Sequence, residues 1–260
     1  MTVLTLLVKA YSSSQLTKID DLLRVEFENL DLDFNVLGAP VNKWVQVSLS
    51  GEDEVIATNY VNKEIGTCPV SIKRVEKFSV LKGYITKVDT VEDELTVDVG
   101  VFEPRIIQAT IPLASLQTQL AGGKKFSLKQ IAELFGFQVD LPLSVKVVDF
   151  DGRESGLLRA ELSAAQLERI GLWRDSLLDR LIVLRATIGD IKSVLERTRL
   201  NRDVIEVERL GLFAHALTCK LGTDAAGLVP KLGRYMRSAR FVVFNSKRLV
   251  GIIGEEALSP

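Results

Sequence analysis

The densest run of basic side chains lies near the C-terminal end of the sequence. Between residues 220 and 248 the only acidic residue is Asp224. The cations of this segment are Lys220, Lys231, Arg234, Arg237, Arg240, Lys247 and Arg248. Such a cluster can neutralise backbone phosphates and release their counterions, which gives affinity for nucleic acid without sequence preference. The aromatic residues Tyr235, Phe241 and Phe244 lie among the cations and could stack on bases.

The same segment has a plainer interpretation. Runs of charge commonly form the solvated face of a helix, and aromatic residues between them commonly pack in the core. Phe241 and Phe244 lie in a strand-like run of mixed pattern, so we expect at least one of them to be buried.

A second set of candidate nucleic-acid contacts lies in the central part of the chain. Its members are Lys82, Tyr84, Lys87, Phe102 and Arg105. The acidic run Glu92-Asp93-Glu94 opposes this interpretation because it would repel phosphate. Lys124 and Lys125 follow a Gly-Gly pair, but the spacing of a phosphate-binding P-loop is absent. Packing of Tyr84 and Phe102 inside the domain, or docking of a protein on it, is an equal alternative.

The residue types that catalysis or metal binding would need are sparse. His215 is the only histidine, and although it would share a strand face with Cys219, Cys68 is the only other soft ligand. Asp89, Asp98, Asp149 and Asp151 lie near expected turns, where aspartate commonly stabilises the turn itself. We therefore expect no catalytic residue, no metal and no cofactor.

Composition narrows the class of protein. The 33 lysines and arginines nearly balance the 34 acidic residues, which argues against a wholly basic nucleic-acid coat and against an acidic disordered chain. The apolar fraction of 47% is enough for buried cores. No stretch reaches the roughly 18 apolar residues of a membrane helix, so we expect a cytoplasmic protein with free thiols.

Hydrophobic periodicity, turns and caps predict three domains, at about 1–78, 79–162 and 163–260. The first has the order β-α-β-β-α-β of a ferredoxin-like module. Gly38-Ala39-Pro40 is expected to turn the chain between its second and third strands, and Ser71–Val80 to provide the fourth. The third domain repeats this order, with strands at Leu181–Thr187, Val204–Leu210, Phe213–Lys220 and Ala239–Phe244. Its connecting helix carries Trp173, which we expect to be a buried anchor.

The central domain has three strand-like runs, one helix and two more strand-like runs, the order of a five-stranded OB barrel. The runs are Val80–Val88, Leu95–Val101, Arg105–Pro112, Val145–Val148 and Leu157–Leu162, the last two separated by a turn at Asp151-Gly152. The helix is expected to begin after Ser127 and to end at Gly136. The segments 82–88, 97–102 and 109–113 resemble the opening strands of RNA-binding OB domains, where a Gly-x-Ile/Val-x-x-Val strand precedes a Val-Asp-x-Gly strand.

The most distinctive sequence segment is Arg202-Asp203-Val204-Ile205-Glu206-Val207-Glu208-Arg209-Leu210-Gly211-Leu212, together with the segment 219–233. It resembles the archaeal domain-of-unknown-function family 2110. The resemblance implies an archaeal cytoplasmic protein and supplies no reaction and no catalytic residues.

Together these patterns predict an α+β protein in which an OB-like β-barrel is flanked by two ferredoxin-like (βαββαβ) modules. The predicted function is non-catalytic RNA binding through the basic C-terminal segment, with the ribosome or another RNA machine as partner. One alternative is a protein-interaction module that forms homodimers through a sheet edge. Another is an enzyme or small-ligand binder with a pocket between barrel and sheet.

Overall fold

The computed structural model describes residues 1–150 and 158–254. The chain divides into two compact units. The first unit contains Met1–Val75 and Gly100–Ile106, and the second contains Glu76–Val99 and Ile107–Pro260. The barrel and the C-terminal sheet therefore belong to one unit. In the described part of the chain, no helix has both the length and the apolar character that crossing a membrane would need.

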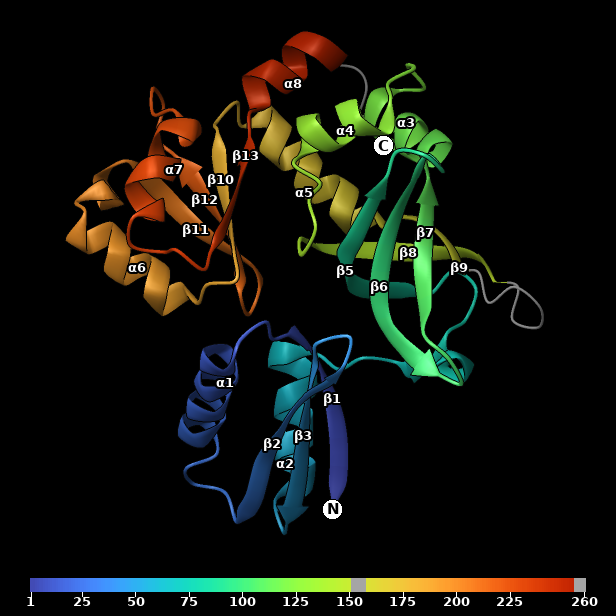
Figure 1. The fold of residues 1–260 in the computed structure, drawn as a ribbon, viewed down its shortest axis with the longest axis vertical. Helices are drawn as coiled ribbons and strands as arrows, with labels where there is room; N and C mark the ends of the chain where they lie inside the picture. Colours follow the sequence, from blue (N-terminus) through green and yellow to red (C-terminus); the bar gives the residue numbers. More distant parts are fainter. Residues whose placement is uncertain (151–157, 255–260) are drawn as a thin grey trace. The chain divides into compact units, whose positions relative to one another are not determined.

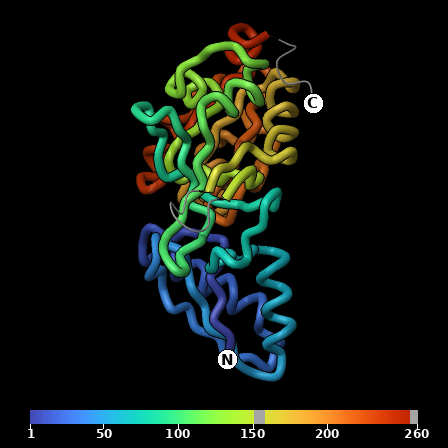
Figure 2. Tube along the Cα trace, turned by 90° about the vertical axis from the view of Figure 1, so that its right-hand side faces the viewer, coloured from blue at the N-terminus to red at the C-terminus, as the bar shows by residue number. Residues whose placement is uncertain are grey.

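The first unit is built on a three-stranded antiparallel sheet of order β1-β3-β2 (Figure 1). Its elements are β1 (Thr2–Lys9), α1 (Ser13–Glu26), β2 (Leu32–Val41), β3 (Trp44–Gly51), α2 (Glu54–Tyr60), a π-helical turn (Val61–Ile65), β4 (Val70–Ser71) and a 3-10 turn (Ile72–Arg74). Helix α1 contacts β2, and α2 contacts β3. Leu6 of β1, Val47 of β3 and Leu23 of α1 are fully buried. The π-helical turn continues α2 without a break (Figure 2).

The turn predicted at Gly38-Ala39-Pro40 is wrong. These residues continue β2, and the chain turns at Asn42 and Lys43, whose φ angles are 47° and 68°. Pro40 is tolerated because β2 is an edge strand, where an amide without a hydrogen costs no ladder bond. Gly38, at φ 101°, coincides with an irregularity in the pairing to β3.

The fourth strand predicted at Ser71–Val80 is also wrong. Only one antiparallel bridge, between Leu6 and Thr67, extends the sheet on this side. The ladder stops there because the chain turns away at Val70, the next residue whose amide would face β1, where φ is 63°. The chain then forms β4, which pairs in parallel with β6 instead.

The second unit begins with a closed five-stranded barrel, in which β5, β8, β9, β7 and β6 follow one another around the circumference (Figure 1). Its elements are β5 (Val80–Asp89), β6 (Glu94–Glu103), β7 (Ile107–Pro112), α3 (Leu113–Ala121), α4 (Leu128–Phe135), β8 (Pro142–Phe150) and β9 (Leu158–Leu162). The five predicted strands are present, although Leu157 and the turn at Asp151-Gly152 lie outside the described residues. Inward side chains such as Val97, Ile111 and Val145 are fully buried.

The helix predicted after Ser127 is confirmed as α4. The Ser127 hydroxyl accepts a hydrogen bond from the amide of Gln130, whose side chain accepts in return from the Ser127 amide, and Gly136 ends the helix at φ 68°. Helix α3 was not predicted. Its signals are Leu116 and Leu120, one turn apart, and Gly122, which ends the helix at φ 58°.

The C-terminal part of the second unit is a four-stranded antiparallel sheet of order β11-β12-β10-β13. Its elements are α5 (Ala164–Asp175), β10 (Arg180–Leu184), α6 (Ile188–Arg197), a 3-10 turn (Leu200–Arg202), β11 (Val204–Gly211), β12 (Ala214–Cys219), α7 (Ala225–Gly233), β13 (Arg240–Phe244) and α8 (Ser246–Ile253). Helices α6 and α7 share one apolar core with the sheet, represented by Leu181, Leu195, Leu217 and Leu228.

The connecting helix α5 is anchored against the sheet through Trp173, as predicted. The indole is 6% exposed, packs edge-on against Phe244 at 5.3 Å between ring centroids, and donates its N–H to Glu208 at 2.8 Å. The Arg180 guanidinium lies 5.4 Å from the indole ring centre and donates to the carbonyl oxygen of Trp173. Because Glu208 is on β11 and Phe244 on β13, Trp173 holds α5 to two strands of the sheet.

Candidate nucleic-acid interface

The cations of the 220–248 segment lie at three separate places on the C-terminal sheet and its helices. Residue 180 of β10 pairs with residue 244 of β13, and residue 184 pairs with residue 240. Lys220, after β12, and Lys247, after β13, therefore lie at the end of the sheet where β10 begins. Arg240 lies at the opposite end, and Lys231 and Arg234 lie at the end of α7. Strand direction thus separates residues that are neighbours in the sequence.

A basic groove lies beside the C-terminal ends of α6 and α7. Its volume is about 470 Å³. Its lining residues are Arg197, Thr198, Leu200, Pro230, Lys231, Arg234 and Tyr235. We call this feature the α6–α7 groove. Three of its lining side chains are cations and none is a carboxylate, so it is suited to hold an anion such as phosphate.

Local sequence signals place these cations at the groove. Thr187 and Asp190 form a capping box that starts α6, and the Thr198 hydroxyl donates to the carbonyl oxygen of Val194 at 2.7 Å where the helix ends. Burial of Ile191 and Leu195 fixes the rotation of α6 and leaves Arg197 exposed at its last position.

Helix α7 is positioned by the same kind of signal. Asp224 caps it by accepting from the amides of Ala226 and Gly227 at 3.0 and 3.2 Å. Burial of Leu228 and Leu232 against the sheet core leaves Lys231 and Arg234 exposed at its C-terminal end. Cations at this end also interact favourably with the negative pole of the helix dipole.

A stacked pair forms one wall of the α6–α7 groove. The guanidinium carbon of Arg197 lies 4.3 Å from the centre of the Tyr235 ring, within the range of a cation–π interaction. Tyr235 nevertheless remains 47% exposed. Phe241 and Phe244, the other aromatic candidates, instead contribute to packing, because Phe241 contacts the apolar core and Phe244 is fully buried.

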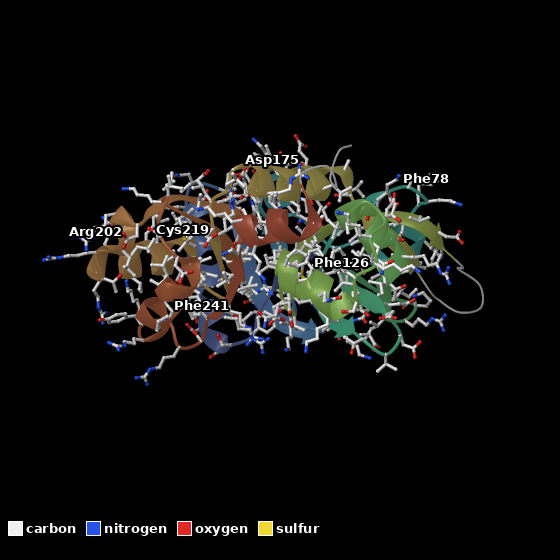
Figure 3. All side chains as sticks on the ribbon, turned by 90° about the horizontal axis from the view of Figure 1, so that it is seen from above. Phe78, Phe126, Asp175, Arg202, Cys219 and Phe241 are labelled. Atoms are coloured by element: carbon white, nitrogen blue, oxygen red, sulfur yellow. The ribbon has the colours of Figure 1, made fainter. Side chains whose placement is uncertain are left out.

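Sequence reasoning missed Arg197 and its neighbours. Arg197, Arg199 and Arg202 form a basic run immediately before β11. Figure 3 shows the Arg202 side chain directed away from the ribbon at the edge of the second unit. The spacing of the three arginines was the signal that could have found this surface.

Lys220 and Lys247 occupy a more mixed environment. They line a cavity of about 200 Å³ together with Asp179, Asp224 and Asn245. Burial, and then the nearby charge of Asp224, raise the pKa of Asp179, although a hydrogen bond from the Ala225 amide opposes that shift. The two carboxylates offset the two lysines, so this end of the sheet is a poorer phosphate site than the α6–α7 groove.

Arg240 faces a carboxylate that is already paired. The Arg185 guanidinium donates through Nε to Oδ2 of Asp140 at 3.0 Å, and it also donates through Nη2 to the same oxygen. Arg240 Nη1 lies 3.8 Å from that oxygen. This cluster links the loop before β8 of the barrel to β10 and β13 of the C-terminal sheet. Arg237 and Arg248 are exposed.

The barrel candidates are divided between the two units. Tyr84 is only 8% exposed, and a methyl group added to Gly211 would lie 3.5 Å from its hydroxyl oxygen, so its ring is not placed to stack on a base. Lys82 is exposed on β5 of the second unit, whereas Arg105 is exposed in the first unit. Glu92 and Asp93 are exposed in the turn between β5 and β6, which makes that loop unfavourable for phosphate.

His215 and Cys219 lie in β12 and point to the same face, but a separation of four strand residues, about 13 Å, is too large for one metal ion. Burial, and secondarily Arg209, lower the pKa of His215 to about 4, and burial raises the pKa of the Cys219 thiol to about 11. Cys68 is buried in the first unit, where its thiol donates to the Leu6 carbonyl oxygen at 3.3 Å. No group of three or more potential metal ligands occurs within 1–150 and 158–254.

Comparison with protein-family models gives matches along the chain to the N-terminal domain of DUF2110 at residues 3–71, its central domain at 75–174 and its C-terminal domain at 178–244. The chain belongs to the DUF2110 family. The central match includes the barrel and α5, which follows β9 directly. The side chain of Trp173 on α5 nevertheless packs against the C-terminal sheet. A search of curated proteins gave no match.

Proposed function

We propose that this DUF2110 protein is a non-catalytic RNA-binding protein that docks on phosphates through the α6–α7 groove. The observation that supports this most strongly is the lining of the groove, in which Arg197, Lys231 and Arg234 are present without a carboxylate. The neighbouring Arg199 and Arg202 extend the positive surface beyond the groove. A groove of about 470 Å³ is of the size that takes a small ligand or one unit of a polymer.

The overall charge suits docking of one surface on a large RNA assembly. The chain carries a formal net charge of only −1, so its cationic surface is local. We accordingly propose the archaeal ribosome or another RNA machine as the partner, and the cytoplasm as the compartment. Neither Cys68 nor Cys219 forms a disulfide, as is usual in reducing compartments.

The strand orders support assigning fold names to the modules. Numbered along the barrel, the strands follow the circular order 1-2-3-5-4, with a helical connection between the third and fourth, which is consistent with an OB barrel. The C-terminal sheet has the antiparallel order 2-3-1-4 with a helix after its first and third strands, consistent with a ferredoxin-like module. The first unit has the same order without a full fourth strand. The protein would then use the helical face of the third module for RNA, and not the acidic barrel turn.

The direct test is the salt dependence of RNA binding. Lys231→Gln/Arg234→Gln removes two groove cations, and Lys63→Gln/Lys129→Gln removes two exposed cations elsewhere, so both variants have the same net charge. We expect the groove variant to lower the slope of log affinity against log salt by about 1.4, at about 0.7 per single-strand phosphate contact. The control variant should keep the wild-type slope. Equal slopes in all three proteins, or no RNA binding at low salt, would exclude the proposal.

A homodimer is a second candidate because β2, a ten-residue strand, is an edge of the three-stranded sheet and Leu37 on it is 47% exposed. Sedimentation velocity of the purified protein tests this candidate. A dimer that dissociates in a Leu37→Lys variant would support it, and a monomer at all concentrations would exclude it.

A further inference from the structure

The aromatic wall of the α6–α7 groove carries information about which form of RNA would bind. Phosphate contacts alone do not distinguish single strands from duplexes, since both expose their backbones. An exposed ring that lies beside the phosphate-binding cations does distinguish them, because it can stack only on a base that is not already stacked in a helix. Tyr235 is such a ring, and it lies next in the chain to Arg234.

The geometry of the Arg197–Tyr235 pair leaves room for a base. The guanidinium covers one face of the ring, with its central carbon 4.3 Å from the ring centre. Because Tyr235 is still 47% exposed, much of the ring that Arg197 does not cover is open to solvent. The contact with Arg197 also restricts the rotation of the tyrosine side chain, which reduces the entropy lost when a base stacks on it.

The cations of the groove come from the C-terminal ends of two helices. Lys231 and Arg234 come from the end of α7, and Arg197 comes from the end of α6. A nucleotide whose base contacts Tyr235 would therefore have cations from two elements available for its flanking phosphates. Leu200 and Pro230 supply the apolar part of the lining against which a base or ribose can pack.

We propose that the α6–α7 groove takes one unpaired nucleotide of a single-stranded RNA, with its base stacked on Tyr235 and its phosphates on Lys231, Arg234 and Arg197. This inference rests on the proposed function and narrows its substrate to single strands. A free nucleotide has the same chemistry as one unit of the strand. In a single strand, however, neighbouring phosphates add contacts with Arg199 and Arg202, which are exposed next to the groove.

The test compares three probes by fluorescence anisotropy: a labelled oligouridine decamer, a labelled RNA hairpin with the same number of phosphates whose loop is an ethylene glycol linker without unpaired bases, and unlabelled UMP as a competitor. The variants are Tyr235→Leu, which removes the ring, and Tyr235→Phe, which keeps it. We expect Tyr235→Leu to weaken binding of the decamer about 5- to 150-fold and to leave its salt slope unchanged. Tyr235→Phe should bind the decamer with an affinity within about two-fold of the wild type. The hairpin should bind more weakly than the decamer, and neither substitution should change its affinity.

The outcomes separate this inference from the proposed function. If the decamer and the hairpin bind equally and neither responds to Tyr235→Leu, the stacking site is excluded, while a reduced salt slope in Lys231→Gln/Arg234→Gln would still support phosphate docking. If UMP displaces the decamer at equal concentration, the groove is a mononucleotide site and the single-strand assignment is wrong. If no RNA binds, both proposals fail. A thermal melt confirms folding, and Tyr235→Gln, which also removes the ring, repeats the test should Tyr235→Leu unfold.

Discussion

The ion pair between Asp140 and Arg185 offers a quantitative test of how the barrel is joined to the C-terminal sheet. Asp140 accepts two hydrogen bonds from Arg185, and the two side chains are 9% and 23% exposed. Removing one partner of a mostly buried pair leaves the other charge without compensation, and this typically costs about 3–5 kcal/mol. Since Arg185 retains some contact with water, we expect Asp140→Ala to lower the free energy of unfolding of the second unit by about 3 kcal/mol.

The backbone at Asp140 provides an internal comparison. Its φ angle is 77°, a conformation that alanine adopts at a cost of about 1 kcal/mol and glycine adopts freely. Asp140→Gly should therefore destabilise the unit by only about 2 kcal/mol, although it removes the same carboxylate. Asp140→Asn, which keeps a hydrogen-bond acceptor, should cost about 1–2 kcal/mol.

The matched control is Asp149→Ala. Asp149 also pairs with a cation, Lys77 at 3.8 Å, but the two side chains are 67% and 57% exposed. An exposed pair of this kind contributes at most about 0.5 kcal/mol. Urea unfolding followed by tryptophan fluorescence gives the free energies. Hydrogen exchange of peptides from β10 and β13 measures the stability of the second unit separately from that of the first. If Asp140→Ala matches Asp149→Ala, or is more stable than Asp140→Gly, the reasoning is wrong.

Three further predictions concern buried groups of the second unit. The pKa of His215 is lowered from 6.5 to about 4, so the unfolded state takes up a proton at a higher pH than the folded state does. The free energy of unfolding should therefore fall by about 2–3 kcal/mol as the pH drops from 6.5 toward 4. Denaturant midpoints measured across this range should depend less on pH in His215→Leu. The pKa of Cys219 is raised to about 11 by burial, so a thiol reagent at pH 8 should label it at the rate of unfolding, and rapid labelling of the native protein would contradict its burial. Gly83→Ala should cost about 3 kcal/mol or more in thermal or urea unfolding, because the new methyl would lie 2.3 Å from the carbonyl oxygen of Asp98. Gly171→Ala, which meets no atom within 4 Å, should not destabilise the protein.

Elements with strong local signals were predictable from the sequence. Helix α4 lies between Ser127 and Gly136 because a capping hydroxyl and a left-handed glycine act within a few residues of the helix they delimit. Alternating apolar residues likewise identified the barrel strands, since one face of each strand is buried whatever its neighbours are.

Features that depend on distant parts of the chain were not predictable in this way. Pro40 resembled a turn residue because nothing local shows that β2 is an edge strand. Base contact and packing were equal alternatives for Tyr84, because its burial depends on residues such as Gly211, which is far along the chain. The missing fourth strand of the first unit depends on β6, to which β4 pairs instead. In each case the partner that decides the structure is separated by a loop or by a whole module.

The candidate site shows the same division most clearly. A count of charges along the chain shows where cations are close together in sequence. The binding of phosphate depends on how many cations are close together in space and on the carboxylates near them. The sheet carries Lys220 and Lys247 to an end that holds Asp179 and Asp224, and Arg240 to an end that holds Asp140. Lys231 and Arg234, at the end of α7, line a groove without a carboxylate. Arg197, at the end of α6, lines the same groove, although it lies outside the 220–248 segment. The positive surface that remains is therefore smaller than the sequence suggested and is assembled from two helices. Its exposed ring is the reason that we propose a flexible single strand, and not the regular backbone of a duplex, as its ligand.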